Sequence, residues 1–409
     1  MMPHILVSMN PTQDDRAHLP LHGIRVIEFC HMVMGPTCGM ILADMGADVI
    51  KVEPLHGDTT RRLVHQGAGF FATYNRNKRS LALDLKSDSG LKAAKTLCAD
   101  ADIVVENLRP GAMAGLGLGY GDLSTDNPKL VYCALKGFLD GPYAHRKALD
   151  EVVQMMAGLA YMTGPEGRPL RAGASVTDIM GGMFGVIGIM AALRERERTG
   201  RGQPVTTALY ETTVHMVAQH MMQFAVTGVP TGPMPDRPRA WAVYDTFVTK
   251  DGENVFVGIV SDTQWNIFCK AFGRQDLFDD LSLKTNAQRV EARARIMPIL
   301  KGLFGAMKKD ELMAECDRIG LPFAPITKPH DLFDDPHLKQ SGSLLDVTLP
   351  DGEKTKIPGL PVIMNGRRTQ IHHDLPRIGQ HSRDILAEVG FGDDEIDEMI
   401  VDGVILSED

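Results

Sequence analysis

The stretch IRVIEFCHMVMGPTCGMILADMGADVIKVEP, residues 24–54, decides the fold. Its opening IRVIEF (24–29) and its run DVIKVE (48–53) are short and apolar, which predicts two strands. Between them, residues 36–45 begin with Pro and end before Gly46, which is typical of a helix. Because two strands separated by one helix need a crossover connection, we expect them to be parallel.

The same alternation of strands and helices continues toward the middle of the chain. It predicts an α/β fold with a doubly wound, mainly parallel, Rossmann-like sheet in a large domain. Further strands are expected at 80–85, 102–107, 129–135 and 204–208, and further helices at about 88–99, 149–159, 178–196 and 209–226.

The pattern changes after this region. Residues 229–238 contain four prolines, which indicates a linker, and Asp251-Gly252 then separates two apolar runs as in a β-hairpin. Helices near 262–272, 287–304 and 309–319 complete a smaller α+β domain. We therefore predict a flexible leader at 1–20, the first part of the large domain at 21–225, a linker at 226–240, the small domain at 241–330, and a C-terminal part at 331–409 that returns to the large domain.

Composition excludes several classes of protein. The net charge of -9 disfavours a general nucleic-acid binder, which would carry a basic excess. The six cysteines show no CxxC pair and no metal-ligand spacing, so we expect buried thiols in a reducing compartment, the cytoplasm, and no metal site. Residues 1–20 lack the layout of a secretory signal, and the most apolar segment, 179–193, is too short to cross a bilayer of about 30 Å.

Three loops at predicted strand ends could bind an anionic ligand. The first strand–helix junction lacks a GxGxxG fingerprint, and His31 within it is either a ligand contact or a hydrogen-bonded structural histidine. The basic run NRNKR (75–79) suits phosphates, or is a solvated loop. The segment ENLRPG (106–111) offers an amide, a guanidinium and a glycine turn, as a plain loop would too.

The most informative segment is RPLRAGASVTDIMGGMFG, residues 168–185. Asp178 stands at the start of an apolar helix, where it is a helix cap, a nucleophile, or both. We expect the helix N-terminus to keep its carboxylate ionised. Gly181 and Gly182 cost helix stability of about 1 kcal/mol each, so either a thioester or another helix should approach closely there.

Eight segments of the chain carry a resemblance to a known family. They are LHGIRVIEF, GADVIKVEP, NRNKRSLALDL, ENLRPG, LDEVVQMMAGL, RAGASVTDIMGG, RTGRGQPV and GQHSRDIL. Together they resemble the class III CoA-transferases, the CaiB/BaiF-like family of formyl-CoA and carnitine CoA-transferases, from residue 21 to the C-terminus. The resemblance implies a large domain built from both chain ends, a small inserted domain, and a homodimer of two interlocked subunits.

The resemblance also implies roles for individual residues. Asp178 matches the catalytic aspartate of the family, and coenzyme A or acyl-CoA is a substrate, not a permanently bound cofactor. Positions expected to face CoA are His31, Met32, Arg76, Lys78, Arg79, Asn107, Arg109, Met113 and Lys147. Positions expected on the side of the acyl substrate are Val33, Asp150, Arg171 and Gly181.

The reaction that this implies is the movement of CoA between carboxylic acids through an aspartyl mixed anhydride and an aspartyl-CoA thioester. Formyl or oxalyl transfer is disfavoured, because Val33 replaces a glutamine and MPDRPRAWAVYD (234–245) replaces a glycine-rich flap. Arg146, Lys147 and Arg171 suggest a second carboxylate on the substrate, so we expect a succinyl-CoA:dicarboxylate exchange.

Two other functions remain open at this point. One is an α-methylacyl-CoA racemase-like isomerase, which needs a histidine in a GHD motif where this chain has Ala148-Leu149-Asp150. The other is a non-catalytic CoA-binding protein, which the presence of Asp178 disfavours. The expected partners are acyl-CoA and small carboxylic acids, with neither nucleic acid nor membrane.

Overall fold

The computed structural model describes residues 16–236 and 239–407 and divides into two compact units. The large unit contains the residues up to Pro235 and those from Lys339 onward, and the small unit contains Asp236–Leu338. Helix α9 (Leu209–Thr227) continues past residue 225, so the linker predicted at 226–240 starts too early. Of the predicted leader at 1–20, residues 1–15 lie outside the described residues.

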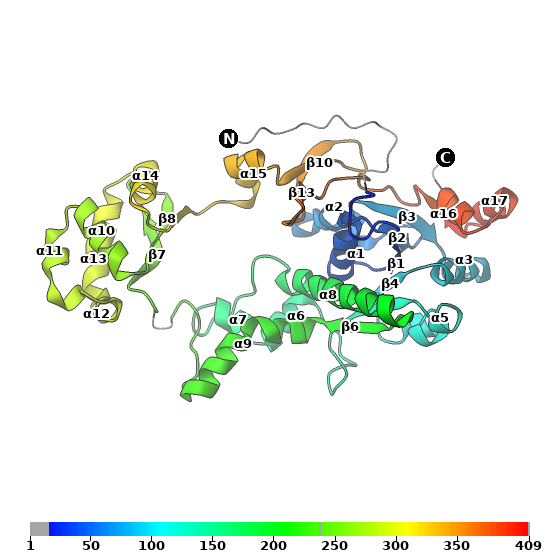
Figure 1. Cartoon of the computed structure of the whole chain (residues 1–409), viewed down its shortest axis with the longest axis horizontal. Coiled ribbons are helices and arrows are strands. Elements are labelled where there is room, and N and C mark those ends of the chain that lie inside the picture. The colour runs from blue at the N-terminus through cyan, green and yellow to red at the C-terminus, as the bar shows by residue number, and fades with distance from the viewer. Residues whose placement is uncertain (1–15, 237–238, 408–409) are drawn as a thin grey trace. The chain divides into compact units, whose positions relative to one another are not determined.

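The large unit is built on one seven-stranded sheet with the order β14-β3-β2-β1-β4-β5-β6 (Figure 1). All neighbouring strands are parallel except β14, which runs antiparallel to β3, so the predicted α/β fold with a mainly parallel sheet is confirmed. The strands are β1 (Arg25–Phe29), β2 (Asp48–Glu53), β3 (Lys78–Leu83), β4 (Ile103–Glu106), β5 (Val131–Lys136), β6 (Pro204–Ala208) and β14 (Ile405–Leu406).

Both faces of this sheet are covered, which explains why its strands are apolar at consecutive positions. Val26 belongs to the core between the sheet and the helices of one face, whereas Ile27 belongs to the core on the other face. The first core includes α1 (Met34–Asp44), α6 (Asp150–Met156), α8 (Val176–Thr199) and α9, and the second includes α3 (Asp88–Ala99), α4 (Ala112–Gly115), α5 (Tyr120–Asp126), α16 (Ser382–Glu388) and α17 (Asp393–Val401).

The C-terminal residues return to the N-terminal part of the chain. Strand β14 completes the sheet beside β3, and the hairpin of β10 (Leu344–Thr348) and β11 (Lys354–Pro358) packs on Phe71 of α2 (Phe70–Tyr74). The remaining short elements of this unit are α7 (Leu159–Thr163), β12 (Ile363–Met364), β13 (Arg367–Arg368) and the 3-10 helices η1 (Thr59–Arg62) and η2 (His65–Gly67), and α15 (Pro336–Ser341) spans the boundary between the units.

The small unit has an antiparallel sheet with its own apolar core. The expected hairpin joins β7 (Val243–Val248) and β8 (Asn254–Ile259), with Gly252 in the turn at φ 78°, and β9 (Phe323–Pro325) pairs with β8. Trp265, Phe268 and Phe304 lie in its core. Its helices are α10 (Asp262–Ala271), α11 (Gln275–Asp279), α12 (Asn286–Glu291), α13 (Arg293–Gly305), α14 (Lys309–Ile319), η3 (Leu281–Leu283) and η4 (Pro329–Asp334).

Helix α8 packs closely against α1 through its glycines. A β-carbon on Gly182 would lie 2.6 Å from the carbonyl oxygen of Met34, and one on Gly181 would lie 2.6 Å from the Met34 side chain. Helix packing is therefore the reason for both glycines, and the predicted substrate contact at Gly181 is wrong because Met34 covers it. Among the described residues only α8 is long and apolar enough to cross a membrane, and it is a helix of this core.

Candidate active site

A cavity of about 680 Å³ opens at the carboxyl ends of β1, β2, β3 and β4. This is the edge at which ligands of doubly wound sheets bind. Its wall is largely apolar, with a few polar groups. It is lined by Phe29, Cys30, His31, Val52, Glu53, Pro54, Leu55, His56, Asp58, Thr59, Leu83, Asp84, Leu85, Lys86 and Leu108.

The loop between β1 and α1 brings His31 to this cavity. Asn107, just after β4, holds the backbone of His31 from both sides, because its Oδ1 accepts from the His31 N–H (3.0 Å) and its Nδ2 donates to the His31 carbonyl (2.8 Å). Met32 has a left-handed backbone (φ 65°), a conformation that non-glycine residues rarely adopt. The cavity walls desolvate the His31 imidazole and lower its pKa.

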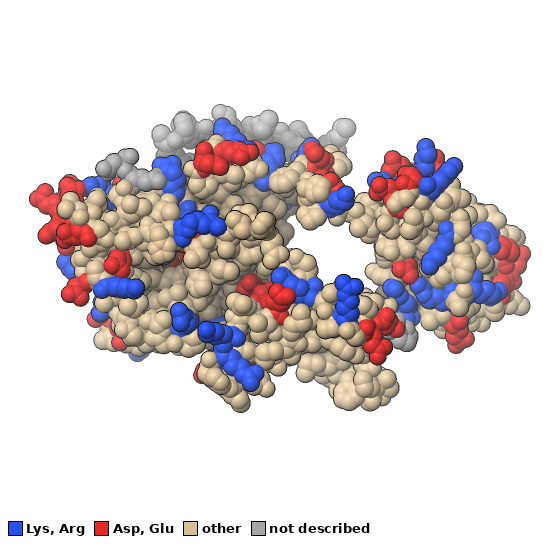
Figure 2. All heavy atoms as spheres, turned by 180° about the vertical axis from the view of Figure 1, so that it is seen from behind, with Lys and Arg blue, Asp and Glu red and all other residues tan. Residues whose placement is uncertain are grey.

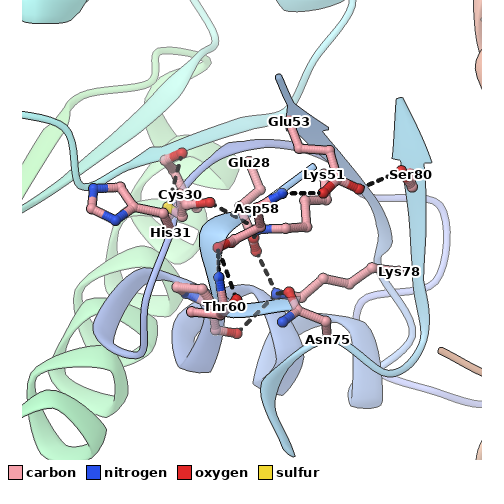
Figure 3. A network of polar contacts seen from close by, with 12 residues as sticks. Glu28, Cys30, His31, Lys51, Glu53, Asp58, Thr60, Asn75, Lys78 and Ser80 are labelled. Carbon is pink, nitrogen blue, oxygen red and sulfur yellow. Dashed lines mark hydrogen bonds and ion pairs between the residues drawn. The ribbon is translucent and has the colours of Figure 1, made fainter. Parts of the chain in front are cut away.

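Two buried lysines share one buried glutamate below the cavity (Figure 3). Lys51 Nζ lies 3.4 Å from Glu28 Oε1, 2.9 Å from Asp58 Oδ2, and 2.8 Å from the Cys30 carbonyl oxygen. Lys78 Nζ lies 2.8 Å from Glu28 Oε2 and donates to the Pro36 carbonyl (3.0 Å). These four side chains are almost fully buried, so each charge depends on its partners for neutralisation.

The acidities in this network follow from its pairing. Burial works to raise the pKa of Asp58, but the Lys51 ammonium outweighs burial and holds this pKa below its ordinary value. Burial works to lower the pKa of Lys51, and Glu28 and Asp58 reverse that effect and raise it. Both groups are therefore ionised at neutral pH.

Asp178 lies in the first turn of α8, beside a second carboxylate from α6. The Oδ2 of Asp150 accepts from the backbone N–H of Thr177 (3.0 Å) and of Asp178 (3.2 Å), while Ser175 provides no side-chain cap. Asp150 is held in turn by Gln154, whose Nε2 donates to its Oδ1 at 2.6 Å. Asp150 thus caps α8, so the Asp178 side chain does not serve as the helix cap.

The expectation that the helix N-terminus keeps Asp178 ionised is wrong. Burial, with a further contribution from the negative charge of Asp150, raises the pKa of Asp178 to about 7, and Arg171 opposes this increase. The backbone amides that could have stabilised the Asp178 carboxylate bind Asp150 instead. Asp178 is therefore divided between its ionised and protonated forms near neutral pH.

Arg171 and Tyr74 complete the surroundings of these carboxylates. Arg171 Nη2 lies 3.5 Å from Asp150 Oδ1, its Nε donates to the Ala172 carbonyl, and its side chain is 30% exposed. The pKa of Tyr74 is raised by burial and by the charges of Asp178 and Asp150. In the part of the chain that the structure describes, no group of three or more His, Cys, Asp or Glu residues could hold a metal ion.

Helix α1 connects the cavity with the start of α8. Its N-terminal end follows directly on the loop of His31, and Met34 in its first turn touches Gly181, one turn after Asp178. Asp178 does not itself line the cavity. The two features are therefore neighbouring parts of one region, linked through residues 31–34.

Comparison with known proteins identifies the family. A family model described as CoA-transferase family III matches residues 21–382. The chain is 32% identical over 403 residues to succinyl-CoA:glutarate CoA-transferase from Mus musculus. This match covers 97% of this chain and 92% of that protein. The chain belongs to CoA-transferase family III.

Two further relatives agree with this assignment. Succinate–glutarate CoA-transferase from Agrobacterium fabrum is 34% identical over 385 residues, covering 90% of this chain and 96% of that protein. The crystal structure of a CAIB/BAIF family protein from Brucella suis matches with a TM-score of 0.81 and 34% identity, over 91% of this chain and 99% of that one. The predictions of an enzyme and of this family are confirmed.

Several residues predicted to face CoA are instead structural in this family III enzyme. Lys78 is fully buried against Glu28, and Arg76 is 3% exposed and paired with Asp44 at 2.7 Å. Arg79 pairs with Asp48 and Glu388 at the opposite end of the sheet. These three predictions are wrong because each charge already has a buried or half-buried carboxylate partner, and Met113 is likewise part of the apolar core.

The other predicted positions are placed as follows. His31 lines the cavity and Asn107 supports it, while Arg109 and Lys147 are exposed on loops. Val33 is 1% exposed, which leaves no surface for the predicted substrate contact. Asp150, Arg171 and Asp178 are brought together, as described above.

Sequence reasoning missed Lys86 and His56, which both line the cavity. Lys86 comes three residues after the end of β3, and His56 three residues after the end of β2. The rule that ligands bind at the carboxyl ends of parallel strands could have pointed to both.

Proposed function

We propose that this enzyme moves CoA from succinyl-CoA to a small dicarboxylic acid, with Asp178 as the nucleophile. The observation that carries the proposal is the position of Asp178 in the first turn of α8, next to Asp150, which caps this helix and pairs with the partly exposed Arg171. Burial and the charge of Asp150 raise the pKa of Asp178 to about 7. Carboxylates with such a shift occur at functional sites more often than elsewhere. Two relatives support the choice of substrates, because one is named a succinyl-CoA:glutarate CoA-transferase and the other a succinate–glutarate CoA-transferase.

The CoA part of the donor is proposed to bind in the cavity at the carboxyl edge of the sheet. The cavity has an apolar wall suited to the adenine ring of CoA, formed by Leu55, Leu83 and Leu85. Lys86 is the cationic side chain in the lining, and His31 and His56 offer further hydrogen-bond donors for phosphate oxygens. The loop 31–34 then leads from this cavity toward Asp178.

The proposed reaction consists of four exchanges at carbonyl carbon. The Asp178 carboxylate attacks the donor thioester, which gives a mixed anhydride and CoA thiolate. The thiolate attacks the aspartyl carbonyl, releases succinate and leaves an aspartyl-CoA thioester. The acceptor carboxylate displaces the thiolate to form a second anhydride, and the thiolate captures the acyl carbonyl of the acceptor. Asp178 is thereby restored.

The two carboxylates have different proposed roles. Asp150 holds the first turn of α8 through two backbone N–H groups, and it raises the pKa of Asp178 by repulsion. A carboxylate with a higher pKa is a stronger nucleophile once it is ionised. Arg171 is 30% exposed and only 3.5 Å from Asp150 in a loose pair, and its proposed role is to bind the distal carboxylate of a dicarboxylate substrate.

The proposal is tested by offering the enzyme succinyl-CoA and a panel of acids of matched length, and following new thioesters by mass spectrometry. Glutarate should exchange at least about ten times faster than valerate, the monocarboxylate of the same length, because only a dicarboxylate engages Arg171. In Arg171→Gln this preference should fall about tenfold, since one charge-assisted hydrogen-bonded pair is lost. Exchange that is absent for every acid, or that survives in Asp178→Ala, would contradict the proposal.

We also propose that the enzyme is a homodimer with interlocked subunits. Met183, Ile187 and Met190 form an exposed apolar stripe on α8, and the end of α9 adds Met222 and Phe224. In Figure 2 this end of α9 protrudes at the lower edge without charged side chains. Large apolar side chains exposed in this way often mark interfaces.

Light scattering should give twice the chain mass of 44.7 kDa, and interlocked subunits should not separate on dilution to nanomolar concentration. Ile187→Glu with Phe224→Glu should lower the yield of the dimer, while a monomeric wild type would contradict the proposal. We further propose that the enzyme works in the cytoplasm, which is supported by six buried cysteines that form no disulfide.

A further inference from the structure

Two loops that follow the neighbouring strands β1 and β2 line the rim of the cavity. The first rim loop is residues 30–33, between β1 and α1, and it carries His31. The second rim loop is residues 54–59, after β2, and it carries His56, Asp58 and Thr59. Neither rim loop is part of the sheet, so contacts other than strand pairing must hold the two loops in place.

One buried ammonium contacts both rim loops. Lys51 Nζ donates to the Cys30 carbonyl of the first rim loop at 2.8 Å and pairs with Asp58 of the second rim loop at 2.9 Å. Lys51 belongs to strand β2, which pairs with β1 and β3, and its side chain is fully buried. Figure 3 shows its side chain pointing toward Cys30 and Asp58.

Asp58 also forms hydrogen bonds to residues on either side of it in the chain. Its Oδ1 accepts from the backbone N–H (2.9 Å) and the hydroxyl (2.8 Å) of Thr60, and its own backbone N–H donates to Glu53 Oε2 (2.7 Å). The first rim loop is held a second time by Asn107, through its two hydrogen bonds to the backbone of His31. The side chain of Asn107 is not part of the cavity lining.

We propose that Lys51 and Asn107 are positioning residues that fix the two rim loops before the CoA thioester arrives. This inference rests on the proposed function, because it takes the cavity as the CoA site. Fixing a site in its bound shape improves affinity by removing the cost of ordering it. An ammonium suits this role because it can bind a carbonyl and a carboxylate at once.

A second buried ion pair supplies a matched control. Arg76 and Asp44 are almost fully buried and lie 2.7 Å apart. Neither residue lines the cavity, and neither is among the partners of Lys51. The double variant Lys51→Met/Asp58→Asn and the double variant Arg76→Met/Asp44→Asn each remove one positive and one negative buried charge, so both keep the charge balance.

The test measures the Kd for CoA and the separate KM values for donor and acceptor, together with the unfolding temperature. In Asn107→Ala, which changes no buried charge, we expect the donor KM and the Kd to rise about tenfold, with kcat and acceptor KM within about twofold. Lys51→Met/Asp58→Asn should show the same pattern. Arg76→Met/Asp44→Asn should lose similar thermal stability with donor KM within about twofold of wild type.

A donor KM that stays at the wild-type value in both Asn107→Ala and Lys51→Met/Asp58→Asn would overturn the inference. So would an equal rise in the Arg76→Met/Asp44→Asn control, since the effect would then be general destabilisation. Failure of the proposed function is distinct from both results. It would show as a wild-type enzyme that neither binds CoA nor exchanges thioesters.

Discussion

Asp58 and Asp178 are both aspartates shielded from water, yet their partners give them opposite acidities. Asp58 has a lysine ammonium at 2.9 Å and a lowered pKa, whereas Asp178 has another carboxylate nearby and a pKa of about 7. Asp178 forms no ion pair within the described residues. A neutralised carboxylate stabilises a loop, while an unneutralised one keeps the reactivity that a nucleophile needs.

The largest expected difference between the two sites is in activity. Asp178→Asn should reduce the rate of CoA exchange by about 10³-fold or more, because an amide cannot form the anhydride. Asp58→Asn should keep kcat within about tenfold, provided that the protein is folded at the assay temperature. Steady-state assays of both variants at 25 °C, with circular dichroism as the folding control, make this comparison. Equal losses in both variants would remove the distinction.

The second difference is in stability, and its sign is opposite at the two sites. Asp58→Asn leaves Lys51 short of one buried counter-charge, so the free energy of unfolding at pH 8 should fall by about 3 kcal/mol. Asp178→Asn removes a charge that burial disfavours, so stability at pH 8 should rise by about 1–3 kcal/mol.

The dependence on pH separates these two effects. The raised pKa of Asp178 means that its ionisation costs stability above the unfolded pKa of about 4, so the gain in Asp178→Asn should vanish below about pH 4. The lowered pKa of Asp58 gives stability that is present above about pH 4 and lost as the pH falls further. Urea unfolding at pH 8 and pH 4 measures the free energy of unfolding of both variants. If both variants were less stable, or both more stable, than wild type at pH 8, the comparison would fail.

The smallest effect concerns the pH profile of catalysis. Since only ionised Asp178 is nucleophilic, kcat/KM should fall about tenfold per pH unit below an inflection near pH 7. Asp150→Asn removes the repelling charge, so the inflection should move toward lower pH by about one unit. The amide oxygen of the introduced asparagine can still accept from the first backbone N–H groups of α8, so the variant keeps the helix cap while it removes the charge. An inflection that does not move would assign the raised pKa to burial alone.

Much of the fold followed from local patterns. The strands at 24–29 and 48–53 were predictable because buried parallel strands are apolar at consecutive positions, and the hairpin at Asp251-Gly252 because its turn favours these residues. Strand β14 was not predicted, since two residues give no periodic pattern. The Gly181-Gly182 pair was recognised as a close approach, but only the structure shows that α1 is what approaches.

The site was less predictable, because its electrostatics depends on contacts between distant residues. The run NRNKR was expected to bind phosphates, yet Arg76 and Lys78 pair with Asp44 and Glu28, which lie 32 and more residues earlier in the chain. The acidity of Asp178 was predicted with the wrong sign for the same reason. Asp150, 28 residues away, takes the backbone amides that local reasoning gave to Asp178.

The central claim is that Asp178 becomes acylated during turnover. Wild-type enzyme should be incubated with succinyl-CoA, treated with hydroxylamine or borohydride, digested and analysed by tandem mass spectrometry. A hydroxamate or a reduced side chain at Asp178, absent without the donor, is the predicted result. Rapid exchange accompanied by an unmodified Asp178, or by a label on another residue, would contradict the account.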